Sequence, residues 1–149
     1  MNHKYFTIEE LIYSENALKK YDIRNKTTQS VENNLDYLIT HLLDPIREKW
    51  GKPIQITSGY RCKELNDKIG GSATSQHVFG LAADLDAGSP SKNRELAKLI
   101  VSMGISFDQL IDEKNYAWVH IGLSTTKPNR KQILRYNGKS YINITANQL

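Results

Sequence analysis

Apolar residues recur at spacings of three and four between residues 31 and 49. This spacing places them on one side of an amphipathic helix over about 31–49. The apolar positions of the helix are Val31, Leu35, Leu38, Ile39, Leu42, Leu43 and Ile46. Pro45 predicts a kink or an early end, and Gly51 followed by Pro53 predicts the final stop.

Two further helices carry start signals. Thr7 stands three residues before Glu10, which is the spacing of a capping box, and a short helix is expected to begin after it. Apolar residues at helical spacing predict another helix over about 91–103, capped by Ser89 or Ser91.

Shorter stretches alternate with a period of two, which is typical of half-buried strands. We expect strands over 54–57, 81–86, 107–111 and 118–123, and short strands on either side of a turn at Asn137-Gly138. Residues 63–76 show no apolar period and predict a loop with at most one helical turn. The order predicts an α+β domain in which helices pack on one side of a small antiparallel sheet.

Length and composition restrict the classes that remain. The 149 residues predict a single domain, 1–149, with a core over about 5–136 and a basic C-terminal extension over 124–149. Apolar residues at 39% and charged residues at 24% exclude a disordered chain. No apolar run has the length of a membrane span or forms a signal core. We expect a monomer made in the cytoplasm, without a membrane partner.

Two of the four histidines, His77 and His120, lie where a role in metal binding is expected. Alternation directs His120 away from the core side of its strand, and it directs Asp84 away from the core side of the strand over 81–86. His77 precedes that strand in a loop rich in Gly and Ser. Two histidines and one aspartate would leave a fourth zinc position open, as catalytic sites do. The alternative is structural, with His77 capping a loop and Asp84 closing a turn.

A longer signature surrounds these residues. Ser75, His77, Gly80, Ala82 and Asp84 match Ser-x-His-x-x-Gly-x-Ala-x-Asp. The chain in this respect resembles the zinc peptidoglycan peptidases. These are the D-alanyl-D-alanine carboxypeptidases and the L-alanyl-D-glutamate endopeptidases, whose fold is shared with Hedgehog signalling domains. The segments Ser-Gly-Tyr-Arg at 58–61 and Trp-Val-His at 118–120 also match, and the resemblance covers about residues 5–136.

The resemblance implies a function and a ligand set. The protein would hydrolyse an amide bond in the peptidoglycan stem peptide, with one Zn²⁺ ion held by His77, Asp84 and His120. Arg61 would hold a substrate carboxylate or the carbonyl oxygen, since a guanidinium fork suits both; otherwise it is a surface residue.

Four more residues are candidates for substrate binding or for support of the metal ligands. They are Ser75, Asp86, Gln109 and Trp118. Ser75 would fix the loop that carries His77 by hydrogen bonding. Asp86 would either orient a ligand histidine or form a solvated strand end.

The sequence leaves the identity of the general base undecided. Many relatives carry an acid three residues before the last histidine ligand, where this chain has Ala117. The nearest acids are Asp112 and Glu113, which point to opposite faces of a strand. Spacing from Gln109 and the partial match to relatives favour Glu113 over Asp112, with Tyr116 or no base at all as the remaining alternatives. Periodicity does not decide which face meets the metal.

Other functions remain possible on the sequence. A non-catalytic zinc-binding module, as in Hedgehog domains, is compatible with Ala117. A nucleic-acid-binding domain would use the C-terminal basic residues, which a solvated face or contact with the anionic cell wall explains better. These residues are Lys127, Arg130, Lys131, Arg135 and Lys139. The missing signal segment is consistent with a bacteriophage or prophage lysis enzyme that reaches the cell wall through a membrane pore.

Overall fold

The structure is a computed structural model that describes residues 3–124 and 128–149. Its helices are α1 (Ile8–Ile12), α2 (Gln29–Leu38), α3 (Asp44–Trp50), α4 (Lys63–Lys68) and α5 (Pro90–Ser102). Short π or 3₁₀ turns are η1 (Asn16–Lys20), η2 (Ile39–Leu43), η3 (Gln76–Phe79) and η4 (Ala146–Gln148). The strands are β1 (Gln55–Ser58), β2 (Ala82–Asp86), β3 (Gln109–Glu113), β4 (Trp118–Gly122), β5 (Gln132–Tyr136) and β6 (Tyr141–Asn143).

The six strands form one sheet in the order β1-β2-β4-β3-β5-β6. The α+β class is confirmed, but the prediction of a wholly antiparallel sheet is wrong, because β5 runs parallel to β3. The antiparallel β3–β4 pair brings the end of β4 back beside Gln109 at the start of β3. Lys131 and Gln132 then donate backbone hydrogen bonds to Phe107 and Asp108, so β5 starts where β3 starts and follows its direction.

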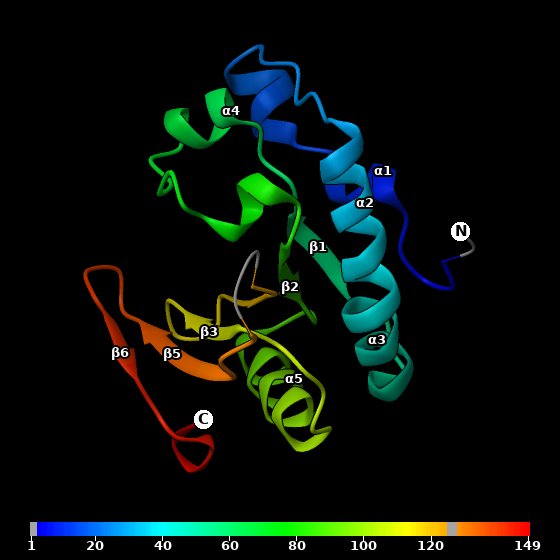
Figure 1. The fold of residues 1–149 in the computed structure, drawn as a ribbon. Coiled ribbons are helices and arrows are strands. Elements are labelled where there is room, and N and C mark those ends of the chain that lie inside the picture. Colours follow the sequence, from blue (N-terminus) through cyan, green and yellow to red (C-terminus); the bar gives the residue numbers. More distant parts are fainter. Residues whose placement is uncertain (1–2, 125–127) are drawn as a thin grey trace.

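Helices cover one face of this sheet, as predicted. In Figure 1, α2 and α3 form one long rod beside β1 and β2, and α5 lies below the middle of the sheet, where it packs on β3 and β4. The β5–β6 hairpin forms the edge of the sheet opposite β1. The core joins the buried sides of these helices to alternate residues of the central strands. These strand residues are Ala83, Leu85, Leu110, Val119 and Ile121. The opposite face of the same strands is therefore left for the functional site.

The helix predicted over 31–49 is confirmed as the continuous run of α2, η2 and α3. Pro45 does not end it, since η2 widens the helix just before the proline and Asp44 donates to the Ile39 carbonyl five residues back. A wider turn gives room to a ring that has no N–H to donate. Gly51 ends the run in a left-handed conformation with φ 76°.

The remaining predictions differ from the structure mainly at boundaries. The capping box at Thr7 and the cap of α5 at Ser89 are present. The stretch 63–76 holds α4 and the first residue of η3, which is more helix than the expected single turn. β3 begins at Gln109, two residues later than predicted, and extends to Glu113. In the part of the chain that the structure describes, no helix has the length and apolar character needed to cross a membrane.

Candidate metal centre

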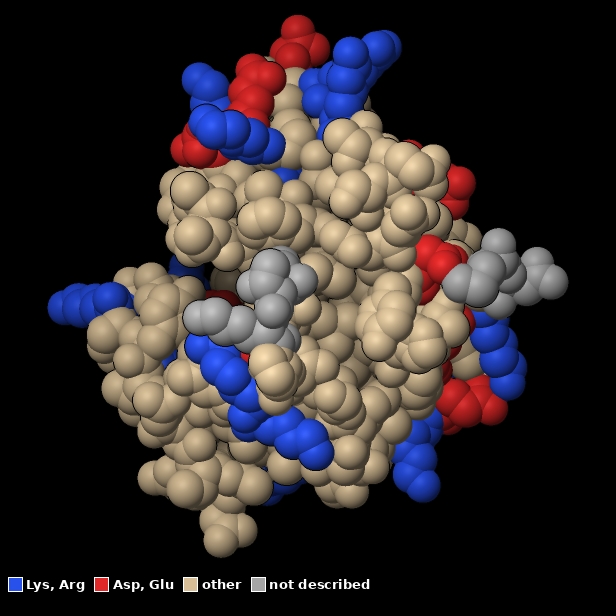
Figure 2. All heavy atoms as spheres, viewed as in Figure 1, with Lys and Arg blue, Asp and Glu red and all other residues tan. Residues whose placement is uncertain are grey.

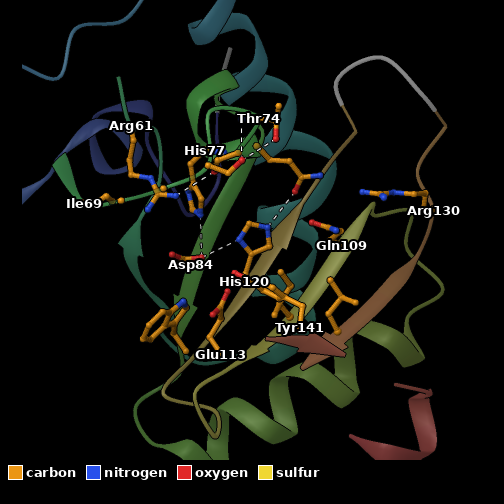
Figure 3. Close-up of a pocket in the computed structure, with 18 residues that line it drawn as sticks. Arg61, Ile69, Thr74, His77, Asp84, Gln109, Glu113, His120, Arg130 and Tyr141 are labelled. Carbon is orange, nitrogen blue, oxygen red and sulfur yellow. Dashed lines mark hydrogen bonds and ion pairs between the residues drawn. The ribbon is translucent and has the colours of Figure 1, made fainter. Parts of the chain in front are cut away.

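The three predicted ligands come together on the face of the sheet opposite α2, α3 and α5. Asp84 on β2 lies directly opposite His120 on β4, and the turn η3 brings His77 above them. Figure 3 shows Asp84 between the two histidine rings. All three side chains are buried and line a cleft of about 520 Å³.

The distances between the possible ligand atoms suit a zinc ion. Asp84 Oδ1 lies 3.3 Å from His77 Nε2 and 3.2 Å from His120 Nδ1. Tetrahedral zinc with bonds of about 2.0–2.2 Å separates its ligand atoms by roughly 3.3–3.5 Å. All three candidate atoms lie within 4.8 Å of one another. One carboxylate and two imidazoles therefore form a site that fits Zn²⁺ in composition and in spacing.

The charge of Asp84 is set by this neighbourhood. Burial opposes its ionisation, but ion pairing and hydrogen bonding with His77 and His120 outweigh burial, and the pKa of Asp84 lies well below its usual range. A carboxylate that stays ionised is ready to bind a cation.

His77 is held by the chain that follows β1. Its Nδ1 donates a 2.7 Å hydrogen bond to the Gly59 carbonyl, which leaves Nε2 free to face Asp84. Ser75 caps η3 by accepting from the His77 backbone N–H. Residue 59 must be glycine because a Cβ there would lie 2.3 Å from the backbone oxygen of Leu11.

His120 is held by a chain of side chains that was not predicted from the sequence. Its Nε2 lies 3.2 Å from Gln76 Oε1, and Gln76 Nε2 donates to Asp108 at 2.7 Å. Arg130 in turn pairs with Asp108. Gln76 and Asp108 are separated by 32 residues, so no spacing rule relates them. A metal-bound histidine generally donates its other ring N–H to an acceptor, and this rule would have predicted an acceptor beside His120.

Glu113 and Asp112 have opposite orientations. Glu113 lines the cleft on the same face of β3 as Ile111, the cross-strand neighbour of His120. Asp112 is directed to the other face and accepts from the Tyr116 backbone and from Arg135 Nε at 2.8 Å. Desolvation and the nearby charge of Asp84 raise the pKa of Glu113 to about 7.

Arg61 reaches the cleft beside His77 (Figure 3). Its Nη2 donates to Ser75 Oγ at 3.3 Å, and its buried Nε has no hydrogen-bond partner among the described residues. Burial lowers the pKa of Arg61, while the carboxylates of Asp84 and Glu113 act in the opposite direction. An arginine starts from so high a pKa that the guanidinium stays charged, so the cleft holds a cation with an unused donor.

The other predicted site residues divide into two groups. Gln109 and Trp118 line the cleft, and Gln109 donates to Gln132 at 2.9 Å. Asp86 instead lies at the end of β2 and accepts from Gly88 and from Asn93 on α5. Asp86 therefore fits the strand-end alternative, and the structure gives it no contact with a ligand histidine.

The C-terminal part contributes to the cleft in a way that was not predicted. Leu134 and Tyr141 line it, and the Tyr141 ring stacks on Tyr136 with centroids 4.4 Å apart. These residues carry no motif, and only the parallel pairing of β5 with β3 brings them to the site.

Two of the five residues of the predicted basic cluster are neutralised by acidic partners. Arg130 and Arg135 pair with the buried Asp108 and Asp112. Lys127 lies outside the described residues. Figure 2 shows Lys and Arg in separate groups on this side of the molecule, with acidic residues beside some of them, rather than as one basic face. This distribution favours the solvated-face interpretation over a nucleic-acid surface.

Comparison with known proteins agrees with the site. Residues 4–122 match the model of the peptidase M15 family, and the chain belongs to this family. The resemblance inferred from the signature is thereby confirmed. The zinc D-Ala-D-Ala carboxypeptidase of Streptomyces albus G is 44% identical over 48 residues, which are 32% of this chain and 19% of that protein. The chain thus matches about a fifth of the length of this relative.

Proposed function

We propose that this protein is a zinc metallopeptidase that hydrolyses an amide bond in the stem peptide of peptidoglycan. The observation that carries the proposal is the spacing of His77 Nε2, Asp84 Oδ1 and His120 Nδ1 in a cleft of peptide size. Membership of a peptidase family and the name of the Streptomyces relative support the choice of metal and substrate.

Zinc bound here would supply a Lewis acid for the scissile carbonyl and would lower the pKa of a coordinated water. The protein must still take up the proton of that water. Glu113 is the candidate general base, because it lines the same cleft and its pKa of about 7 matches a proton acceptor at neutral pH. The ion pair of Asp112 with Arg135 on the other face of β3 supports the choice of Glu113 over Asp112.

Arg61 is proposed to bind the substrate. The Arg61 guanidinium lines the cleft and donates to Ser75 Oγ through Nη2, while its Nε is buried without a hydrogen-bond partner among the described residues. A planar fork in this position suits a peptide carboxylate, or the oxygen on which negative charge grows during hydrolysis. Gln109 and Trp118 form adjacent parts of the wall and are proposed to contact the stem peptide.

The experiment is digestion of purified peptidoglycan by the full chain loaded with zinc. Turbidity reports wall clearance, free D-alanine reports carboxypeptidase cleavage, and new amino termini report an internal cut. We expect one of these products, loss of activity with a chelator and recovery with Zn²⁺. Glu113→Gln should lower the rate of hydrolysis about 10²- to 10⁴-fold and keep zinc, whereas the exposed Glu95→Gln on α5 is the matched control with unchanged rates.

Metal analysis tests the ligand set separately. We expect about one zinc ion per chain and its loss in His120→Ala. Undiminished zinc in that variant would contradict the assignment of the ligands. Full zinc without any cleaved bond would instead favour the alternative, a non-catalytic zinc-binding module.

A further inference from the structure

We propose that Gln76 is a positioning residue, which Asp108 and Arg130 orient so that His120 presents Nδ1 to the metal. The inference rests on the proposed metal site and not on hydrolysis. It concerns which ring nitrogen of His120 carries the proton, because only the nitrogen without a proton can bind the metal.

The chain of hydrogen bonds begins at Asp108, a buried residue just before β3. Arg130 donates to it three times, from its backbone N–H and Nε to Oδ1 and from Nη2 to Oδ2 at 2.8 Å. The bidentate pair keeps Asp108 an ionised carboxylate and holds its pKa below the usual range.

An ionised carboxylate only accepts hydrogen bonds. The Gln76 amide must therefore turn its nitrogen to Asp108 Oδ2, where the distance is 2.7 Å. This orientation turns the amide oxygen toward His120. The charge of Asp108 thus fixes the orientation of the Gln76 amide, and the amide oxygen becomes the acceptor at the His120 ring.

The acceptor then selects the tautomer of His120. Gln76 Oε1 lies 3.2 Å from Nε2, so Nε2 has to carry the ring proton. A neutral imidazole carries a single N–H, and the lone pair is left on Nδ1. This atom lies 3.2 Å from Asp84 Oδ1, on the side of the ring where the metal would bind. The dashed lines at His120 in Figure 3 mark both contacts.

Gly122 makes room for this arrangement. A Cβ at residue 122 would lie 1.9 Å from Gln76 Oε1. The backbone of Gly122 lies in a region open to any residue, so the strand itself does not require glycine there. The space is needed by the Gln76 amide, which indicates a site shaped around its contact with His120.

The first test is Asp108→Asn. The Asn oxygen would accept the two bonds from Arg130 to Oδ1, so its NH₂ group would face Gln76 and force the Gln76 amide to turn. His120 Nε2–H would then meet a donor. We expect the dissociation constant for zinc, measured by chelator competition from the loaded protein, to rise about 10- to 100-fold. The His120 Nε2–H proton should exchange with water faster in ¹H–¹⁵N spectra.

The second test restores the contact by exchanging the two groups in a double variant that combines Gln76→Glu with Asp108→Asn. The new amide nitrogen at position 108 donates to the new carboxylate at position 76, and this carboxylate accepts from His120. The charge of the pair is unchanged. We expect zinc affinity and protection of the ring proton to return toward the wild-type values.

Gly122→Ala is a further variant that leaves Asp108 and Arg130 intact, and its Cβ would also lie 3.2 Å from His120 Nε2. It should displace the Gln76 amide and weaken zinc binding to a similar extent. Thermal unfolding of every variant identifies a merely structural role, which would lower the melting temperature and leave zinc affinity and proton exchange unchanged.

The proposal is overturned if folded Asp108→Asn and Gly122→Ala both bind zinc as the wild type does, or if the double variant recovers nothing. Wild-type protein that binds zinc but cleaves no cell wall would contradict the proposed function and leave this inference standing.

Discussion

Asp112 and Glu113 are neighbours on β3, yet the two faces of the sheet treat their charges differently. Asp112 is 2% exposed and Glu113 8% exposed, so both are buried. Asp112 pairs with Arg135 and accepts from the Tyr116 backbone. The Glu113 side chain has no hydrogen bond or ion pair within the described residues, and burial raises its pKa to about 7.

The same contrast extends beyond this pair. The buried carboxylate of Asp108 is paired with Arg130, while Arg61 keeps a buried Nε that has no hydrogen-bond partner among the described residues. A buried charge with partners stabilises a fold, whereas a buried charge without them keeps capacity for a substrate or a proton. Burial alone therefore does not identify a functional acid, whereas unused hydrogen-bonding capacity on the cleft face does.

The strongest test of this comparison is Glu113→Gln. The amide keeps the shape and removes the proton acceptor, so we expect the rate of peptidoglycan hydrolysis to fall about 10²- to 10⁴-fold with zinc content unchanged. Steady-state kinetics measure the rate of hydrolysis, and metal analysis of the same preparation measures the zinc content. Wild-type rates would place the base elsewhere.

Substitution of Arg61 by Lys should have the next largest effect. An ammonium cannot reproduce the bidentate fork, and we expect kcat/KM to fall about 10- to 100-fold while zinc remains bound. Unchanged kinetics would mean that the unpartnered Nε has no role in the reaction.

The dependence of kcat/KM on pH sharpens the assignment of Glu113. A base must be ionised, and a raised pKa means that activity is lost as pH falls through that raised value. Bound Zn²⁺ would lower the pKa from about 7 toward the ordinary 4.5, so we expect the acid limb of the loaded enzyme between these values. An acid limb that persists in the residual activity of Glu113→Gln would belong to another group.

Asp112→Asn should affect stability rather than catalysis. Loss of the ion pair with Arg135 is expected to lower the free energy of unfolding by about 1–3 kcal/mol, measured with urea. Turnover per folded molecule should match the wild type. A catalytic loss as large as that of Glu113→Gln would remove the distinction between the two faces.

The smallest effect is expected for Asp86→Ala. It removes bonds to Gly88 and Asn93 and should cost about 1 kcal/mol of stability in the same urea experiment. Zinc affinity should not change, and a weakened metal site would restore Asp86 as a supporting residue of the ligands.

Local patterns predicted much of the fold. The long helix follows from apolar residues between Val31 and Ile46, and the central strands follow from alternation. The parallel pairing of β5 with β3 could not be predicted, because it depends on where the chain after β4 is anchored by Phe107 and Asp108. Pairing between strands is a tertiary contact, and a period of two is the same in both directions.

Part of the candidate site could also be predicted from local sequence patterns. The candidate ligands His77, Asp84 and His120 follow from residue types at a specific spacing, and the structure brings their possible ligand atoms together. The chain from Arg130 through Asp108 to Gln76 joins residues far apart in sequence, and neither a period nor a motif relates them.

The α+β class, the family signature and the alternation that puts Asp112 and Glu113 on opposite faces of one strand can all be inferred from local sequence patterns. Which of the two acids meets the cleft depends on how the sheet packs. The helices dock on the side of Leu110 and Val119, so Asp112 lies on the covered side and Glu113 on the side of the metal ligands. Alternation relates residues within a strand, but the choice of the covered face depends on packing against helices that are distant in the chain.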